Sequence, residues 1–257
     1  MKSLTKIVGI ITCFILTATI TAQTKINASD IMKDIKSGKD ITYKNVTIVG
    51  ELDFTFMDEQ LIKLPKKRKF SWWNNNSDNK IKKEIRNKVS FVNCTFEDDV
   101  FAYQHDEKSG YTFIANFVDV VIFKNCEFKE MALFKYSHFS AKSDFSDSKF
   151  NGDSSFKEAD FKKDISFSNT TFEQKSTFKY TSFRRKASFS NAVFKESAIF
   201  KYTSFREGVS FNKTRFEEDL DIKYMKVSGD FDISGMHVEY NIDSKYTKIN
   251  GERFSYN

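Results

Sequence analysis

The chain has 257 residues, of which 41 are Lys or Arg and 35 are Asp or Glu, so its formal net charge at pH 7 is +6. It contains 29 Phe but only 9 Gly and 1 Pro. The modest charge excludes a strongly acidic or basic chain, and the excess of Phe indicates one structural position that recurs many times.

Residues 1–22 predict a secretory signal peptide, with Lys2 and Lys6 as a short basic start, an apolar stretch over residues 7–16 and a small-residue end. The apolar stretch is too short for a membrane span, and no later segment approaches the necessary length. A lipid anchor at Cys13 is the alternative, but this residue lies inside the apolar stretch. We therefore expect an exported protein, periplasmic or extracellular, with no membrane span once the signal is removed.

Residues 23–40 form an N-terminal segment that contains a predicted capping helix. Residues 29–37 are amphipathic, with Ser29 or Asp30 as the expected N-cap and Gly38 as the stop. An open solenoid exposes apolar core and unpaired strand edges, so this helix is expected to plug one end of the fold. The last stretch, residues 244–257, is expected to cap the other end.

The centre of the chain is one array of Phe residues. From Phe123 to Phe216, a Phe occurs at spacings of five and six residues in strict alternation. The same alternation continues through Ile222, Val227, Ile233 and Val238 and reaches back to Phe91 and Phe96 and to Ile48 and Phe54. The full unit is 22 residues, because the segment Phe-Lys-Tyr-Thr-Ser-Phe at residues 178–183 recurs at residues 200–205.

The spacing distinguishes a helix from a strand. At about 100° per residue, steps of five and six residues turn a helix by about 140° and 240°, which scatters the Phe over separate faces. In an extended chain, positions two apart share a face, and the residue two before each Phe is usually small, as at Ser137, Thr181 and Ala192. Four such pieces close a square coil, and stacked coils pair as parallel strands about 4.8 Å apart.

These repeats resemble the pentapeptide-repeat family, whose motif is a small residue, a polar residue, Leu or Phe, and two polar residues. The sequence at residues 159–163, Ala-Asp-Phe-Lys-Lys, matches it, and that at residues 181–185, Thr-Ser-Phe-Arg-Arg, matches more loosely. The resemblance covers roughly residues 41–254. It implies an all-β fold, a right-handed quadrilateral parallel β-helix over residues 41–257. The alternate six-residue spacing departs from the motif and leaves the corner geometry open.

Two loop insertions interrupt the repeat, near residues 58–84 and 104–115. Counting coils places both near the third side, where we expect them to lie next to each other. The first holds the single Pro and both Trp, and one interpretation is a solvated loop with one packed Trp. Because long loops on a rigid scaffold often carry function, the other is a candidate insertion site. That site comprises Lys66, Lys67, Arg68, Trp72 and Trp73.

The sequence predicts no catalytic, cofactor or metal site. His105, His138 and His237 fall on different sides or in a loop, with no spacing that gathers metal ligands. Cys94 and Cys126 occupy the same inward slot in successive coils, where an oxidising compartment permits a disulfide. Stacked neighbours about 4.8 Å apart exceed the usual Cβ separation of about 3.8 Å, however, which favours two thiols.

A Lys/Tyr ladder follows the third side of the coil, interrupted only by Glu158. It comprises Lys135, Lys157, Lys179, Lys201, Lys223 and Lys245 with Tyr103, Tyr136, Tyr180, Tyr202, Tyr224 and Tyr246. With Arg184 and Arg185 on the following side it forms a candidate binding strip, whereas the second side carries a series of Glu. One account is cation–π and aliphatic contact, copied by repeat duplication. The other is a basic and aromatic strip that binds an anionic polymer or an acidic protein.

These features predict a non-enzymatic, exported binding or scaffold protein. The alternative is a surface-associated structural rod that self-associates, whereas an enzyme would require acids or His that converge. Some relatives in the pentapeptide-repeat family imitate DNA and shield a topoisomerase, but that role requires an acidic rod in the cytoplasm. Nucleic acid is also not an expected partner of an exported protein.

Overall fold

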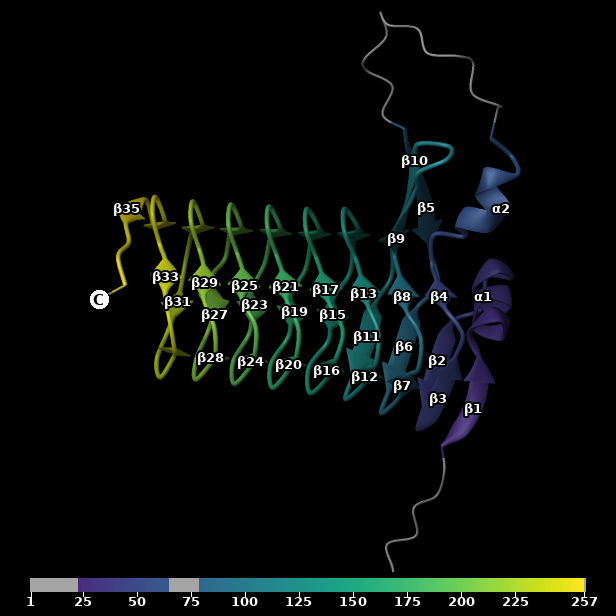
Figure 1. The fold of residues 1–257 in the computed structure, drawn as a ribbon, viewed down its shortest axis with the longest axis horizontal. Coiled ribbons are helices and arrows are strands. Elements are labelled where there is room, and N and C mark those ends of the chain that lie inside the picture. Colours follow the sequence, from purple (N-terminus) through teal and green to yellow (C-terminus); the bar gives the residue numbers. More distant parts are fainter. Residues whose placement is uncertain (1–22, 65–78, 257) are drawn as a thin grey trace, which may run out of the picture.

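The protein folds as a four-sided parallel β-helix, as the repeat predicts. The computed structural model describes residues 23–64 and 79–256. Figure 1 shows a straight row of stacked coils, with helix α1 (Ala28–Lys36) at the N-terminal end. The predicted signal peptide and the candidate insertion site of Lys66, Lys67, Arg68, Trp72 and Trp73 lie outside the described residues.

Each coil contributes one strand to each of four sheets, in the order B, A, C and D. Sheet B contains β2 (Ile41–Lys44), β6 (Val89–Val92), β11 (Val121–Lys124), β15 (Ser143–Asp144), β19 (Ile165–Ser166), β23 (Ala187–Ser188), β27 (Val209–Ser210) and β31 (Phe231–Asp232). Sheet A contains β1 (Thr24–Asn27), β3 (Val46–Val49), β7 (Thr95–Phe96), β12 (Glu127–Phe128), β16 (Lys149–Phe150), β20 (Thr171–Phe172), β24 (Val193–Phe194), β28 (Arg215–Phe216) and β32 (His237–Val238).

The other two sheets complete the square. Sheet C contains β4 (Leu52–Asp53), β8 (Val100–Phe101), β13 (Ala132–Leu133), β17 (Ser154–Ser155), β21 (Ser176–Thr177), β25 (Ala198–Ile199), β29 (Leu220–Asp221) and β33 (Ile242–Asp243). Sheet D contains β5 (Lys80–Ile85), β10 (Tyr111–Phe117), β14 (His138–Phe139), β18 (Asp160–Phe161), β22 (Ser182–Phe183), β26 (Ser204–Phe205), β30 (Lys226–Val227), β34 (Lys248–Ile249) and β35 (Glu252–Arg253). Stacked coils pair in parallel, so that Phe150 lies opposite Phe172.

The Phe residues fill the centre of the square as stacked columns. The rings of Phe156 and Phe178 stack at 5.1 Å with their planes 5° apart. Neighbouring columns meet edge to face, as where Phe178 and Phe189 are 5.2 Å apart at 86°. Burying each Phe contributes about 1.5–3 kcal/mol, and each ring pair adds roughly 0.5–1.5 kcal/mol. One aromatic core therefore runs along the coils.

The inward Thr residues satisfy backbone carbonyls of the preceding coil. The hydroxyl of Thr181 donates to the Phe156 carbonyl at 2.7 Å, and that of Thr203 donates to Phe178 at 2.7 Å. Cys94 and Cys126 occupy the equivalent position at another corner and are buried free thiols. A buried carbonyl without a partner is costly, which explains why Ser and Thr recur in this slot.

The alternating spacing corresponds to two kinds of corner. The five-residue steps cross the corner from sheet B to sheet A, here the B–A corner, and the corner from sheet C to sheet D, here the C–D corner. At both, one residue has a positive φ, such as Asp147 at 60° and Tyr180 at 62°. The six-residue steps cross the other two corners. The sequence motif left the corner geometry open. The structure shows that each regular coil has one residue in the left-handed backbone conformation at each of two opposite corners.

The insertions are not simple loops, contrary to the sequence prediction. The first begins with α2 (Met57–Leu61) and ends in β5, and the second forms a hairpin of β9 (Tyr103–Asp106) and β10. β5 pairs in parallel with β10, which confirms that the described parts of the two insertions lie side by side. The alternating aromatic and β-branched residues of β10 favour a strand, which extends sheet D beyond the coils (Figure 1).

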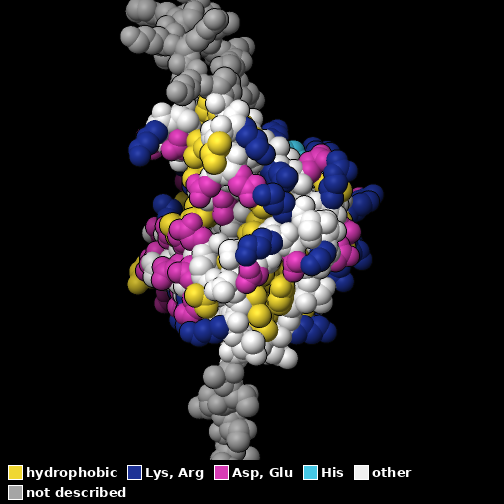
Figure 2. Space-filling model, turned by 90° about the vertical axis from the view of Figure 1, so that its right-hand side faces the viewer, with side chains coloured by type: hydrophobic (Ala, Val, Ile, Leu, Met, Phe, Trp, Pro, Cys, Tyr) yellow, Lys and Arg dark blue, Asp and Glu magenta, His cyan; other side chains and the backbone are white. Residues whose placement is uncertain are grey.

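Helix α1 plugs the N-terminal end, as predicted. Ala28, Ile31 and Ile35 are buried in the core. The N-cap is Asn27 rather than the predicted Ser29 or Asp30, because β1 pairs with β3 as far as Asn27 and the chain turns directly into the helix. Figure 2 looks onto this end, where basic, acidic and apolar side chains are intermingled.

The C-terminal end is covered more thinly. Sheets A, B and C end at β32, β31 and β33, and only in sheet D does a further strand, β35, fold back antiparallel on β34. The tail then crosses the end: Phe254 packs on Phe231 at 5.3 Å, and the Tyr256 hydroxyl donates to the Met236 carbonyl at 3.4 Å. In the described ranges, no helix has the length and apolar character to cross a membrane.

Candidate functional site

The Lys/Tyr ladder lies along the C–D corner. Each Lys of the ladder directly follows the strand and inward residue that end the sheet C side, and from Tyr136 to Tyr246 the next residue has a positive φ. The φ values of Tyr180, Tyr202 and Tyr224 are 62°, 61° and 59°. A bulky L-residue adopts this conformation at a cost of roughly 1–2 kcal/mol. The corner therefore holds its Tyr side chains against a local backbone preference.

Four ladder tyrosines form one parallel stack. Tyr180 and Tyr202 are 4.7 Å apart with planes 5° apart, Tyr202 and Tyr224 are 4.6 Å apart at 7°, and Tyr224 and Tyr246 are 4.7 Å apart at 22°. The four residues are 36–47% exposed. Because each ring covers the face of its neighbour, the stack presents ring edges and hydroxyl groups to solvent rather than ring faces.

Three of the ladder lysines lie within cation–π distance of these rings. The Nζ atoms of Lys179, Lys201 and Lys245 are 5.2, 5.5 and 5.2 Å from the ring centroids of the Tyr that follow them. Lys223 instead forms an ion pair with Asp243 at 2.5 Å, and this hydrogen bond raises the pKa of Lys223. The cation–π contacts of one of the two accounts of the ladder are therefore present at three of these four lysines, and they offset part of the repulsion between stacked ammonium groups.

Glu158 divides the ladder into two parts. It takes the place of a Tyr between Tyr136 and Tyr180, and Lys157 lies 3.7 Å from its carboxylate. On the N-terminal side of this break, Tyr103 and Tyr136 are 5.6 Å apart and tilted by 34°, with the Lys135 Nζ 5.0 Å from the Tyr103 ring. Burial lowers the pKa of Lys135, and the neighbouring charge of Lys157 adds to this effect.

Residues 134–182 and 178–225, which carry most of the ladder, match a family model described as pentapeptide repeats in nine copies. This match agrees with the four-sided coils and with the small inward residue before each Phe. The matched residues are pentapeptide repeats. No curated protein matches it, and no solved structure does. The coils of this pentapeptide-repeat protein continue with the same strand pairing on both sides of the matched residues.

Two further lysines, which belong to the first insertion, lie close to aromatic rings at the C–D corner. Both lie on β5: the Lys80 Nζ is 4.9 Å from the Tyr136 ring, and the Lys83 Nζ is 5.2 Å from the Phe56 ring. Sequence reasoning missed them because the repeat register stops before the insertion, so no spacing relates β5 to the ladder. The Lys-rich composition of residues 80–83 was the only available signal.

Arg184 and Arg185 lie beyond sheet D rather than on the ladder, and both are ion-paired. Arg184 donates from Nε and Nη2 to the two carboxylate oxygens of Asp160, each at 2.8 Å, and Arg185 pairs with Glu207. His138 Nδ1 also lies 3.4 Å from Asp160. Burial raises the pKa of Asp160, but the hydrogen bonds with His138 and Arg184 outweigh it and lower that pKa to about 2.

Several glutamates of the second side are likewise paired. Glu173 bridges Lys149 at 3.0 Å and Lys195 at 2.9 Å, and similar pairs join Glu97 to Lys129 and Glu217 to Arg215. This side is therefore a mixed ionic surface rather than an acidic one. Among the described residues, His, Cys, Asp and Glu side chains do not gather in threes that would hold a metal ion.

Proposed function

We propose that this pentapeptide-repeat protein is an exported, non-enzymatic binding module that recognises an extended anionic polymer through its Lys/Tyr ladder. The observation that carries the proposal is the stack of four exposed Tyr rings with ammonium groups beside them. A ligand that approaches this stack meets ring edges, hydroxyl groups and ammonium groups. Ring edges carry the positive side of the aromatic quadrupole, and the other two groups donate hydrogen bonds, so all three favour an anion.

The repetition of the ladder favours a polymer over a small anion. Cationic and aromatic groups recur once per coil, about 4.8 Å apart, along a straight line. A linear polyanion that engages one position raises the effective concentration of its next charge at the following position. Single-stranded nucleic acid is less suited, because its bases bind by stacking on open ring faces, and the inner faces of this stack are covered.

The ion pairs of Asp160 and Glu173 support the proposal of a non-enzymatic role. The nearly buried carboxylate of Asp160 is held by Arg184 and His138, and Glu173 is held by Lys149 and Lys195. These acids serve ion pairs between coils and do not converge on a common point. The proposal of export is supported by the predicted signal peptide.

The test measures binding of the mature protein to heparin, used as the anionic polymer, over a range of salt concentrations. Retention should fall steeply with salt, and the variant Lys179→Gln/Lys201→Gln/Lys223→Gln should lose most of it. The matched control Lys149→Gln/Lys195→Gln/Lys213→Gln removes the same charge away from the ladder and should keep most of it. Equal losses in the two variants, or no retention of the wild type at low salt, would refute the proposal.

A second candidate function is a rod that associates through its C-terminal end. Phe231, Ile233, Val238 and Ile242 are only partly buried there, and three of the four sheets end in an unpaired strand within the described chain. The N-terminal end, by contrast, is plugged by α1, so an end-to-end contact would close as a dimer rather than continue as a filament. Sedimentation equilibrium over a wide concentration range tests this, and a constant monomer mass would exclude it.

A further inference from the structure

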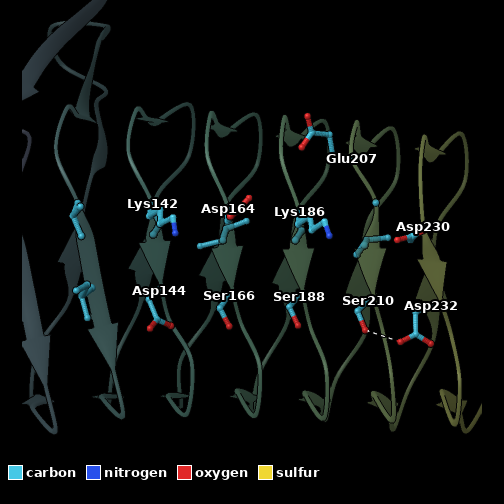
Figure 3. Close-up of a pocket in the computed structure, with 17 residues that line it drawn as sticks. Lys142, Asp144, Asp164, Ser166, Lys186, Ser188, Glu207, Ser210, Asp230 and Asp232 are labelled. Carbon is cyan, nitrogen blue, oxygen red and sulfur yellow. Dashed lines mark hydrogen bonds between the residues drawn. The ribbon is translucent and has the colours of Figure 1, made fainter.

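A second concave surface lies on the outer face of sheet B, away from the ladder. It is a groove of about 690 Å³ that runs across the coils from β11 to β31 (Figure 3). The volume falls within the range of about 300–1,000 Å³ typical of ligand clefts. The groove exists because the outward residues of this sheet are small, namely Ser166, Ser188 and Ser210 with Gly208 beside them, whereas sheet A presents Lys149 and Arg215.

Four exposed charges line one side of the groove in alternating sign, and Glu207, which pairs with Arg185, also lines the groove. Successive coils place Lys142, Asp164, Lys186 and, past Gly208, Asp230 along this side (Figure 3). None of the four forms an ion pair or side-chain hydrogen bond within the described chain. Their capacity to donate and accept hydrogen bonds therefore remains available, unlike that of the paired charges of sheet A. A hollow of about 450 Å³ adjoins the same side and shares Lys142, Asp164 and Lys186 with the groove.

The opposite side of the groove carries the hydroxyl groups of Ser166, Ser188 and Ser210, with the carboxylates of Asp144 and Asp232 at the two ends of the row (Figure 3). The hydroxyl of Ser188 donates to the hydroxyl of Ser190 at 3.1 Å, and the hydroxyls of Ser190 and Ser210 are 2.9 Å apart. The Ser210 hydroxyl donates in turn to the Asp232 carboxylate at 3.1 Å. These contacts hold the row in one orientation. A ligand in the groove would thus lie on backbone and short aliphatic groups, with hydroxyls between two carboxylates on one side and charges of both signs on the other.

We propose that this groove binds a linear, uncharged polysaccharide. A polyanion would be repelled by carboxylates such as Asp144, Asp164 and Asp232. A polycation would be repelled by Lys142 and Lys186, which alternate with Asp164 along the groove. A neutral chain of sugars avoids this repulsion, because its hydroxyls accept hydrogen bonds from Lys and donate them to Asp. The groove crosses several coils that each rise about 4.8 Å, a length comparable to one hexose in an extended chain. This inference is independent of the proposed function of the ladder.

The test is retention of the mature protein on insoluble neutral polysaccharides, namely cellulose, chitin and a linear β-glucan, in 1 M NaCl. High salt suppresses binding through the ladder. The variant Ser188→Phe fills the groove and should reduce retention at least tenfold. The matched control Ser204→Phe places the same ring at an outward position of sheet D and should bind as the wild type does.

A second variant guards against misfolding of Ser188→Phe. The double variant Asp164→Ala/Lys186→Ala preserves the net charge and the sheet but removes the central hydrogen-bonding groups, and it should also lower retention. The inference is overturned if the wild type binds none of the three polysaccharides in high salt. It is also overturned if Ser204→Phe loses as much retention as Ser188→Phe while circular dichroism shows both folded.

Discussion

The B–A and C–D corners of the coil both contain a residue with positive φ, but they use different side chains there. At the B–A corner the residue with positive φ is usually Asn, as at Asn169 and Asn191, and amide hydrogen bonds link Asn191 to Asn169 at 3.2 Å. At the C–D corner it is usually Tyr. Asn tolerates this conformation far better than an aromatic residue does. The same coils thus contain a less strained solution, so backbone preference alone does not account for the Tyr column.

The largest expected effect tests whether both corners rest on one core. Phe189 belongs to the B–A corner and Phe200 to the C–D corner, and both are fully buried. Phe189→Ala and Phe200→Ala should each lower the free energy of unfolding by about 3–5 kcal/mol, because each leaves a cavity in the aromatic columns. Urea denaturation measures both. A loss at one corner less than half that at the other would contradict a shared core.

Acid should lower the stability of the sheet D side, which follows the C–D corner and contains Asp160. Asp160 has a pKa of about 2 in the folded protein, below the usual unfolded value of about 3.9. Its ionised form therefore stabilises the fold above about pH 5, and this contribution is lost as the pH falls through 2. Asp160→Asn should reduce the acid-induced loss of stability by about 1–2 kcal/mol. Denaturation at pH 5 and pH 2 measures the difference, and identical pH dependence would contradict it.

Exchanging the corner residues separates strain from function. Asn191→Tyr should lower stability by about 1–2 kcal/mol, because Tyr adopts a positive φ less readily and the amide ladder is interrupted. Tyr202→Asn should change stability by less than about 0.5 kcal/mol, because relieved strain offsets lost stacking, yet it should weaken heparin binding. Thermal melting and heparin retention measure the two effects. Loss of stability without loss of binding in Tyr202→Asn would make the Tyr column purely structural.

The smallest expected effect concerns the break in the ladder. Glu158→Gln removes the one carboxylate that stands in the Tyr column, so heparin affinity should rise roughly two- to fivefold, or about 0.5–1 kcal/mol. Affinity measured at low and moderate salt tests this, since the gain should shrink as salt increases. Glu196→Gln, which removes an exposed carboxylate after sheet A, is the matched control, and an equal gain there would indicate net charge alone.

Repetition explains how much of this molecule could be predicted from its sequence. The Phe columns, the inward Ser and Thr and the capping helix follow from patterns that recur or from one clear amphipathic segment. The hairpin of β9 and β10 and the contacts of Lys80 and Lys83 occur once, so no period identifies them. The pairing of Arg184 with Asp160 spans 24 residues and depends on side-chain reach across neighbouring coils rather than on register. The sequence did not predict the sheet B groove, because the groove arises from small side chains, which form no charge or aromatic pattern.

The two ends of the β-helix are covered unequally, so unfolding is expected to begin at one end and proceed toward the other. Each coil contacts only its neighbours, so opening is expected to begin where a terminal coil is least covered and to proceed inward. At the N-terminal end α1 buries three side chains, whereas at the other end the contacts of Phe254 and Tyr256 cover the last coil. Fraying should therefore start beside Tyr246, and amide protection should rise coil by coil from there toward Phe123.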